Sequence, residues 1–382
     1  MAKYKIAWLP GDGIGKDVLN AAKIVLDKLK LDAEYIPGDI GWEFWCKEGN
    51  ALPERTIELL KKTDCCLFGA ITSKPKEEAE AELDPGLKGK RYVYTSPIVK
   101  LRQLFNLRTN LRPCKAYPGN PLNYRNDIDI VVFRENTEDL YSGVEFHALP
   151  KEVMDVLLKN HSAMKKFEKT PLEDIAVSLR ILTRKACQNI VLDAFEYAKK
   201  HKRRSVAVVE KPNVIRETSG LMIREARKIA KEYPEIPLWE TNIDAMCMWL
   251  IKNPQDYDVL VTSNMFGDIV SDLCAQLVGG LGFASSGNIG DDYAVFEPTH
   301  GSAPKHAGMN RINPMAMMLS GVLMLRHLGE KQAADNVEKA IARVIREGKK
   351  VTYDLKLGQG GNPATTSEVA EAVIQAMEVE NA

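Results

Sequence analysis

Two aspartates four residues apart, Asp268 and Asp272, are the residues whose type and spacing most directly predict chemistry. If residues 264–272 are helical, both carboxylates lie on one face, one turn apart. Close like charges are costly unless a cation lies between them, and oxygen ligands favour a hard ion such as Mg2+ or Mn2+. The flanking segments are apolar, which argues against a freely solvated acidic face. The pair therefore predicts a divalent metal site.

The length and composition indicate a globular protein with a large core. The chain has 382 residues, 45% hydrophobic and 27% charged, which suggests two or three domains. Fifty-two basic residues balance 52 acidic ones, so no net charge supports general binding to nucleic acid or a membrane surface. The short basic run 202–204 is expected to be a solvated helix end. We therefore expect neither nucleic acid nor a membrane among the partners.

The cysteines and the first residues predict a cytoplasmic protein. Seven cysteines are scattered among apolar neighbours without a Cys-x-x-Cys pair, as is typical of reduced core thiols. The first residues run directly into a strand pattern, so we expect no signal peptide. The sequence contains no stretch of 18 apolar residues, so we expect no membrane span.

The order of apolar stretches predicts an α/β architecture. Residues 5–9 form a strand pattern, 11–15 a glycine turn, and 18–29 an amphipathic helix. Further strand-like stretches alternate with helical ones, at 65–70, 128–133, 175–179, 205–209 and 259–262. The polar segment 149–171 is expected to be an inserted arm or an oligomer contact, and 369–379 a closing amphipathic helix.

The glycine turn does not predict a dinucleotide site of the Rossmann type. Gly11 and Gly13 match the start of that fingerprint, but Lys16 stands where a third glycine or alanine is needed. No acidic residue at the end of a second strand compensates for the mismatch. We therefore expect an α/β fold of another kind.

Several motifs spread along the chain resemble one enzyme family. They are residues 9–15 (Leu-Pro-Gly-Asp-Gly-Ile-Gly), Leu101-Arg-Gln, Leu111-Arg-Pro113, 134–141 (Arg-Glu-Asn-Thr-Glu-Asp-Leu-Tyr), 264–272 (Asn-Met-Phe-Gly-Asp-Ile-Val-Ser-Asp) and 296–304 (Phe-Glu-Pro-Thr-His-Gly-Ser-Ala-Pro). Over essentially its whole length, the sequence resembles the metal-dependent β-decarboxylating dehydrogenases of the isocitrate and 3-isopropylmalate dehydrogenase family. The members that it resembles most are NADP-dependent isocitrate dehydrogenases.

The resemblance implies a fold and an assembly. Family members have a large α/β domain built from both chain ends and a smaller central domain that includes a clasp. Here this predicts a large coenzyme-binding domain at 1–107 and 279–382, and a small domain with the clasp and dimer interface at 108–278. It also implies a homodimer in which each active site borrows residues from the partner subunit.

The resemblance also assigns roles to residues of the active site. Arg102, Arg112 and Arg134 match the arginines that clamp substrate carboxylates, a task that suits the bidentate guanidinium group. Lys211 matches the lysine that assists removal of the hydroxyl proton, and Tyr141 the acid that protonates the enol carbon.

The implied metal site contains a third ligand from the other subunit. Asp244 matches that ligand and joins Asp268 and Asp272, while Asn213 in the motif around Lys211 is an expected substrate contact. The metal would bind the substrate's 2-hydroxyl and adjacent carboxylate, and would hold the electrons released as the β-carboxylate departs.

The coenzyme region favours NADP. Lys305 directly follows His-Gly-Ser-Ala-Pro, where NAD-linked members usually have an aspartate, and its ammonium suits a 2'-phosphate. Tyr353 also resembles the tyrosine of NADP-linked members. His306, where those members often have tyrosine, and Leu357, near the place of a phosphate-binding arginine, depart from that pattern, so NAD use stays an alternative. Further expected coenzyme contacts are Thr72, His300, Gly301 and Asn313.

Substrate choice depends on the segment before Arg102. Ser96 lies where isocitrate dehydrogenases keep a serine that bonds the third carboxylate, which predicts oxidation of isocitrate to 2-oxoglutarate and CO2. Ile98 and Arg108 fit the prediction of isocitrate as substrate less well. The sequence Ser-Pro-Ile-Val, which contains Ile98, resembles some homoisocitrate dehydrogenases. Homoisocitrate and 3-isopropylmalate are therefore alternative substrates. A catalytically silent regulatory subunit is a further alternative, although the full catalytic set argues against it.

Overall fold

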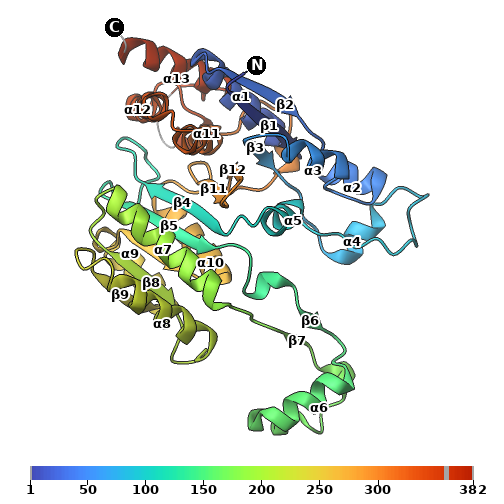
Figure 1. The fold of residues 1–382 in the computed structure, drawn as a ribbon. Coiled ribbons are helices and arrows are strands. Elements are labelled where there is room, and N and C mark those ends of the chain that lie inside the picture. Colours follow the sequence, from blue (N-terminus) through green and yellow to red (C-terminus); the bar gives the residue numbers. More distant parts are fainter. Residues whose placement is uncertain (1, 357–360, 381–382) are drawn as a thin grey trace.

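The computed structural model describes residues 2–356 and 361–380, which form a ten-stranded mixed sheet with helices on both faces (Figure 1). In spatial order the strands are β2 (Ala33–Pro37), β1 (Tyr4–Gly11), β3 (Cys65–Ala70), β12 (Ala294–Pro298), β11 (Ser285–Ile289), β4 (Thr109–Lys115), β5 (Asp129–Glu135), β10 (Val259–Thr262), β8 (Val206–Glu210) and β9 (Leu238–Asn242). β11 and β4 run antiparallel to their neighbours, and the outer strands are parallel. The predicted α/β fold of a non-Rossmann kind is confirmed.

The two faces of the sheet follow from the alternation of strand side chains. In β1, Ile6 and Trp8 pack on one face, while Ala7 and Leu9 pack on the other. The first, which we call the back face, is covered by α1 (Gly15–Lys28), α11 (Met315–His327), α7 (Arg184–Lys200) and α8 (Thr218–Ala230). Behind α1 and α11 lie α12 (Lys331–Glu347) and α13 (Thr366–Glu380). The second, the front face, is covered by α3 (Glu54–Leu60), α5 (Pro97–Leu104), α9 (Ile243–Lys252) and α10 (Asn264–Leu277).

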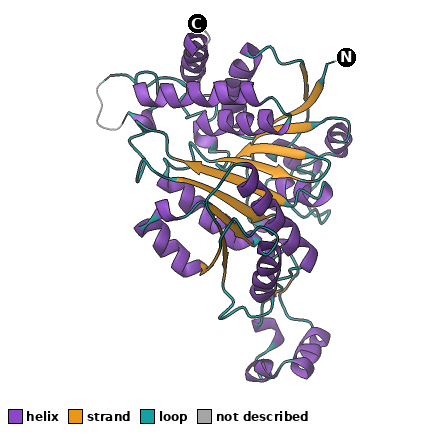
Figure 2. Ribbon diagram, turned by 60° about the vertical axis from the view of Figure 1, so that its left-hand side comes forward, coloured by secondary structure: helices purple, strands orange, loops and turns teal. Residues whose placement is uncertain are grey.

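An arm projects from the body of the molecule (Figures 1 and 2). It carries α6 (Lys151–Asn160) at its tip and the short antiparallel strands β6 (Glu145–Phe146) and β7 (Val177–Ser178). The prediction of an inserted arm at 149–171 is confirmed. The strand predicted at 175–179 is only two residues long, because β7 pairs with a single exposed neighbour and has no core to cover.

The glycine turn connects β1 to α1 as predicted, although the helix begins earlier than expected, at Gly15. Gly11 has a φ of +68°, and a Cβ there would lie 1.9 Å from the carbonyl oxygen of Ala70. Only glycine therefore allows the turn to pack against β3. Two smaller helices, α2 (Trp42–Glu48) and α4 (Lys76–Ala81), pack on each other beside this turn around Trp45.

The prediction of a solvated helix end at 202–204 is confirmed for two of the three residues, since the run follows α7 and Lys202 and Arg204 are exposed. Arg203 is the exception, because it pairs with Asp258 at 2.9 Å and Asp129 at 2.8 Å. All seven cysteines are free thiols, as expected. Within the described ranges, no helix combines the length and the apolar character that crossing a membrane requires.

The division into 1–107 with 279–382 and 108–278 stays a prediction. One continuous sheet crosses both boundaries, since β4 forms ladders with β11 on one side and β5 on the other. Separate hydrophobic clusters nevertheless lie on either side of β4, one around α1, α11, α12 and α13 and another around α7 and α8.

Candidate active site

Three buried arginines converge on the front face of the sheet. Arg102 comes from α5, and strand alternation directs Arg112 of β4 and Arg134 of β5 to the same face. Burial, followed by the charges of Arg112 and Arg102, lowers the pKa of Arg134 to about 9. Guanidinium groups that perturb one another in this way form a site with a strong preference for anions.

A buried polar network positions Arg102. Asn288 on β11 accepts hydrogen bonds from Arg102 Nε at 2.9 Å and from Asn110 Nδ2 at 2.8 Å. Asn288 also donates to Glu297 at 2.8 Å, and Glu297 lies 3.4 Å from Arg102. Asn110, Asn288 and Glu297 had no predicted role; the signal for them is polar residues inside otherwise buried strands.

Arg134 is packed beneath the first turns of α10. Its Nε donates to the backbone and side-chain oxygens of Asn264 at 2.9 and 3.0 Å. A Cβ at Gly267 would lie 2.5 Å from the Arg134 side chain, so glycine permits this approach. The Nη2 of Arg134 is buried without a hydrogen-bond partner among the described residues. A donor in such a place is suited to an oxygen atom of a ligand or of a water molecule.

Asp268 and Asp272 lie on α10, so the predicted helix is confirmed. Asp268 pairs with Arg134, lies 3.3 Å from Arg112, and accepts a hydrogen bond from the Tyr141 hydroxyl at 2.6 Å. Asp272 lies 3.2 Å from Arg112. The side chain of Asp268 is 36% exposed and that of Asp272 is 59% exposed, so the expected shielding from solvent holds only for Asp268.

The two carboxyl groups differ electrostatically. Burial alone would raise the pKa of Asp268, but Arg134, Arg112 and the Tyr141 hydrogen bond more than offset it and hold that pKa below the ordinary value. Burial and the charge of Asp268 raise the pKa of Asp272, with Arg112 acting in the opposite sense. Burial also raises the pKa of Tyr141, as does its hydrogen bond to Asp268. Tyr141 therefore keeps its proton at neutral pH.

The donor set suits a hard divalent ion. Asp268 and Asp272 supply carboxylate oxygens one helical turn apart, and no softer ligand lies beside them in their described surroundings. The described part of the chain brings together no group of three acidic, histidine or cysteine ligands. Further ligands must therefore come from substrate oxygens, water or a second chain.

Lys211, Asn213 and Asp244 lie apart from this cluster. Lys211 follows β8, Asp244 begins α9, and their side chains form an ion pair. Asp244 is 67% exposed, and Asn213 is also exposed. Among the residues that the structure describes, no hydrogen bond or ion pair joins the Lys211–Asp244 pair to Asp268 or Tyr141.

The predicted coenzyme residues nearest the sheet are firmly anchored. Thr72 follows β3, and its hydroxyl lies 2.6 Å from that of Ser302, while its N–H donates to Asp12 at 2.8 Å. Asn313 donates to Asp354 at 3.0 Å. Burial lowers the pKa of His300, whose Nε2 is buried without a partner in the described chain.

The remaining predicted coenzyme residues form a more open surface. Lys305 and His306 belong to the short 3-10 helix η5 (Pro304–His306), with Lys305 exposed. Gly301 is exposed, and a Cβ there would meet no atom within 4 Å. Tyr353 is exposed too, and Arg311, which had no predicted role, lies over its ring at 4.6 Å. Leu357 falls outside the described residues.

The three residues on which the substrate prediction depends lie in different surroundings. Ser96 is the N-cap of α5, is partly buried, and makes no side-chain capping bond. Ile98 packs into the hydrophobic cluster with Leu101 and Leu107. Arg108 pairs with Asp291 and lies 3.2 Å from Asp193 on α7.

Fold and site together define an α/β protein with a cluster of three arginines, suited to anions, beside an acidic pair. Residues 5–373 match the family model described as isocitrate/isopropylmalate dehydrogenase. The chain belongs to this family. It is accordingly a β-decarboxylating dehydrogenase, and family members act on small 2-hydroxy acids, typically with NAD(P) and a divalent metal.

Similar proteins carry different substrate names. The chain is 42% identical to 3-isopropylmalate dehydrogenase of Methanothermobacter thermautotrophicus, over 97% of this chain and 98% of that one. It is 38% identical to isocitrate/homoisocitrate dehydrogenase of Thermus thermophilus, over 98% of both chains. The crystal structure of isocitrate dehydrogenase from Methylococcus capsulatus superimposes with a TM-score of 0.84 at 36% identity, over 98% of this chain and 99% of that one. The chain spans 58% of the length of another relative, protein DlpA of Legionella pneumophila, at 40% identity.

Proposed function

We propose that the protein oxidises isocitrate to 2-oxoglutarate and CO2, with NADP as coenzyme and Mg2+ or Mn2+ as metal. The observation that carries the proposal is the arginine cluster, in which buried Arg134 keeps an unsatisfied Nη2 beside Asp268 and Tyr141. Three guanidinium groups at one site are suited to a substrate with several carboxylates.

The position of Ser96 supports a third carboxylate. Its hydroxyl stands at the start of α5, the helix that carries Arg102, and has no capping role. Ile98, the residue that favours homoisocitrate, packs into the core, and Arg108 is engaged by Asp193 and Asp291. Neither residue thus has a side chain free for substrate selection. Homoisocitrate is the second candidate, because one additional methylene changes affinity by only about 1–3 kcal/mol.

The proposed mechanism assigns one proton transfer to each of two residues. Lys211 takes the proton of the substrate hydroxyl, while the carbon that carries this hydroxyl loses a hydride. Tyr141, which retains its proton, gives it to the carbon left when CO2 departs, and Asp268 orients the tyrosine hydroxyl. Asp268 and Asp272 would hold the divalent ion, which would polarise the hydroxyl and carboxylate oxygens of the substrate, and the coenzyme would take the hydride.

The NADP preference rests on exposed cations. Lys305 and Arg311 have no carboxylate partner in the described ranges, and Tyr353 lies under Arg311. A 2'-phosphate would supply the missing negative charge, whereas the hydroxyls of NAD would leave both cations unmatched. Arg311 was not among the coenzyme residues predicted from the sequence motifs.

A homodimer would complete the site. Asp268 and Asp272 alone provide too few protein ligands, while on the same molecule Asp244 is exposed and Lys211 is partly exposed. Large apolar side chains are also exposed close by: Trp239 on β9, Met248 and Ile251 on α9, and Ile269 on α10. An apolar surface next to half a site favours a second copy of the chain, with Asp244 and Lys211 entering the partner's site.

The decisive experiment is an activity matrix. Isocitrate, homoisocitrate, 3-isopropylmalate and tartrate are each assayed with NADP and with NAD, in the same concentration of Mg2+ and again after EDTA. We expect the highest kcat/KM for isocitrate with NADP, and loss of activity in EDTA. Tenfold higher kcat/KM with homoisocitrate or 3-isopropylmalate would replace the proposed substrate, and no reduced coenzyme with any pair would indicate a regulatory subunit.

A further inference from the structure

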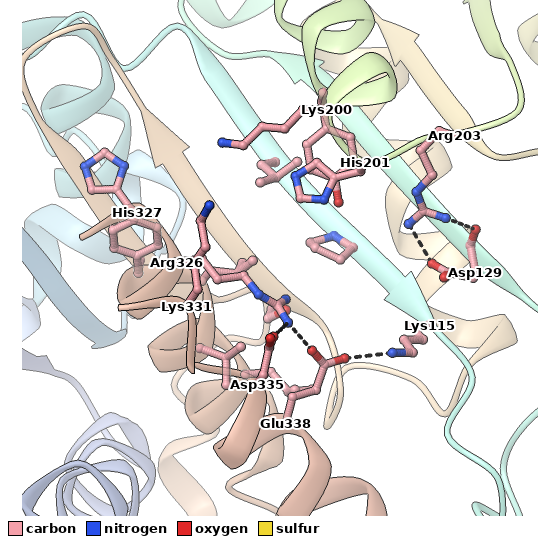
Figure 3. A pocket seen from close by; sticks show the side chains of 18 of the residues that line it. Lys115, Asp129, Lys200, His201, Arg203, Arg326, His327, Lys331, Asp335 and Glu338 are labelled. Carbon is pink, nitrogen blue, oxygen red and sulfur yellow. Dashed lines mark hydrogen bonds and ion pairs between the residues drawn. The ribbon is translucent and has the colours of Figure 1, made fainter. Parts of the chain in front are cut away.

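A cavity lies on the back face of the sheet, and Figure 3 shows side chains that line it. Its volume is about 820 Å³, which falls within the range of small-molecule sites. One wall is the end of α7 with the residues after it, and the other is formed by α11 and α12. The floor consists of side chains from the central strands, among them Leu111 and Phe296.

Strand alternation separates this cavity from the active site. In β4, Leu111, Pro113 and Lys115 face the cavity, while Asn110 and Arg112 face the front. None of Arg102, Arg112, Arg134 or Asp268 lines the cavity. The cavity is therefore a distinct site that shares one strand with the substrate site.

The carboxylates around the cavity are already neutralised. Glu338 accepts from Lys115 at 2.9 Å and also pairs with Arg326. Asp335 lies 3.1 Å from Arg326, and Asp129 and Asp258 pair with Arg203, which sits between them. Every acidic residue of the lining thus has a cationic partner (Figure 3).

Cations without such partners remain. Lys200, Lys202 and Lys331 line the cavity and form no ion pair with any residue that the structure describes. Lys200 extends from the end of α7 and Lys331 from the start of α12, so they approach the opening from opposite walls (Figure 3). An anionic group between them would be bound from both sides.

Aromatic and aliphatic side chains form part of the cavity lining, between its charged residues. His201 stacks on Tyr197 with ring centroids 4.1 Å apart, and His327 lies against Phe296 at 5.5 Å. Partial burial, followed by nearby cations, lowers the pKa of His201, and partial burial lowers that of His327. Both imidazoles are therefore neutral at pH 7 and present aromatic faces rather than charges. The floor adds aliphatic side chains such as Val322.

We propose that this cavity binds a small organic anion: a carboxylate or phosphate carried by a flat apolar group. Lys200 and Lys331 bind the anionic end, and the surfaces of His201, Tyr197 and Phe296 receive the apolar body. The proposal does not depend on which 2-hydroxy acid the front site oxidises.

Titration calorimetry with two probes tests the proposal on the full chain. The probes are 1-naphthyl phosphate and 1-naphthoate, which carry the two anionic groups on one ring system, with neutral 1-naphthalenemethanol as the comparison. We expect at least one anion to bind with one site per chain and at least tenfold more tightly than the neutral compound. Binding should persist in saturating NADP, since the coenzyme residues do not line this cavity.

Two double variants locate the site. Lys200→Gln with Lys331→Gln should weaken binding of the anion by tenfold or more. Lys185→Gln with Lys339→Gln, a matched change of exposed lysines on α7 and α12 outside the lining, should leave it within twofold. Equal affinity for the neutral compound, displacement by NADP, equal loss in both double variants, or no binding of either anion would each overturn the proposal.

Discussion

Two ion pairs of similar chemistry differ in almost every other respect. Arg134–Asp268 lies on the front of the sheet with its arginine 1% exposed. Arg134 donates hydrogen bonds to Asn264, and Asp268 accepts one from Tyr141. Lys211–Asp244 lies at the start of α9 with its carboxylate 67% exposed. The two side chains form a hydrogen-bonded ion pair with each other. The first pair joins a fully buried arginine to a partly buried aspartate. The second is available to other partners.

Because the two ion pairs differ in burial, their variants should differ in how they affect stability and catalysis. Removing one member of a buried pair leaves an uncompensated charge, which is costly to folding, whereas an exposed pair contributes only about 0–1 kcal/mol. A variant of the buried pair should therefore affect both unfolding and catalysis. A variant of the exposed pair should affect catalysis alone, and only if the proposed role of Lys211 is correct.

The largest effect is expected from Asp268→Asn. The variant loses a proposed metal ligand and the anionic partner of Arg134, so we expect kcat/KM to fall about a thousandfold or more, equivalent to about 4 kcal/mol of transition-state stabilisation. The unfolding free energy should fall by about 1–3 kcal/mol, since Asn still accepts hydrogen bonds. Steady-state kinetics and urea unfolding measure the two effects.

Asp256→Asn, which changes an exposed aspartate that pairs with none of the three clustered arginines, is the control and should match wild type in both assays. Wild-type kcat/KM in Asp268→Asn would remove this residue from the proposed metal site. Wild-type stability combined with lost activity would show that the pair with Arg134 contributes nothing to folding, and the contrast between the two pairs would disappear.

Lys211→Met should lower kcat by about a hundredfold or more, because the proposed base is removed. Its unfolding free energy should stay within about 1 kcal/mol of wild type, as expected for an exposed pair. The sharper measurement mixes two inactive proteins, Lys211→Met and Asp268→Asn, after joint refolding.

If Lys211 acts in the partner's site, each mixed dimer contains one site with both residues intact, and random pairing restores about one quarter of wild-type activity. If both residues serve the same chain's site, every mixed site lacks one of them and no activity returns. The second outcome would exclude the shared active site, even if the protein is a dimer.

The proposed coenzyme residues Lys305 and Tyr353 are exposed, as is Asp244, so changes there should also affect activity without affecting stability. Lys305→Asp with Tyr353→Ile should shift the ratio of kcat/KM from NADP towards NAD by about tenfold to a hundredfold, since each lost charge-assisted bond is worth about 1.5–3 kcal/mol. The melting temperature should not change, because both side chains are exposed. Kinetics with both coenzymes measure the shift. A wild type that already prefers NAD would exclude the NADP proposal.

The smallest effect is expected in the acid dependence of stability. Arg134 and Arg112 hold the pKa of Asp268 below its ordinary value despite burial, so its contribution to stability is complete above about pH 5 and is lost as the pH falls further. The difference in unfolding free energy between wild type and Asp268→Asn should therefore shrink between about pH 5 and pH 3. Asp244→Asn should show almost no difference at either pH. A difference for Asp268→Asn that grows on acidification would contradict the assigned charge state.

Local patterns predicted much of the fold, and long-range contacts account for what was missed. The spacing of Asp268 and Asp272 predicted a helix, and α10 confirms it, because that pattern is contained in one turn. Asn288 acts on Arg102 from 186 residues away through neighbouring elements, which no local pattern encodes. Arg203 was expected to be solvated, since the acids that bury it come from β5 and from the residue before β10.

The unbroken sheet has a mechanical consequence. Ten hydrogen-bonded strands run from β2 to β9, so the regions on either side of β4 cannot rotate about a loose linker. Any closing of the front face has to be absorbed as added twist at the ladders of β11, β4 and β5, since breaking those bonds would cost more than bending them. Such a sheet stores elastic energy while the site is closed and returns it when the site opens.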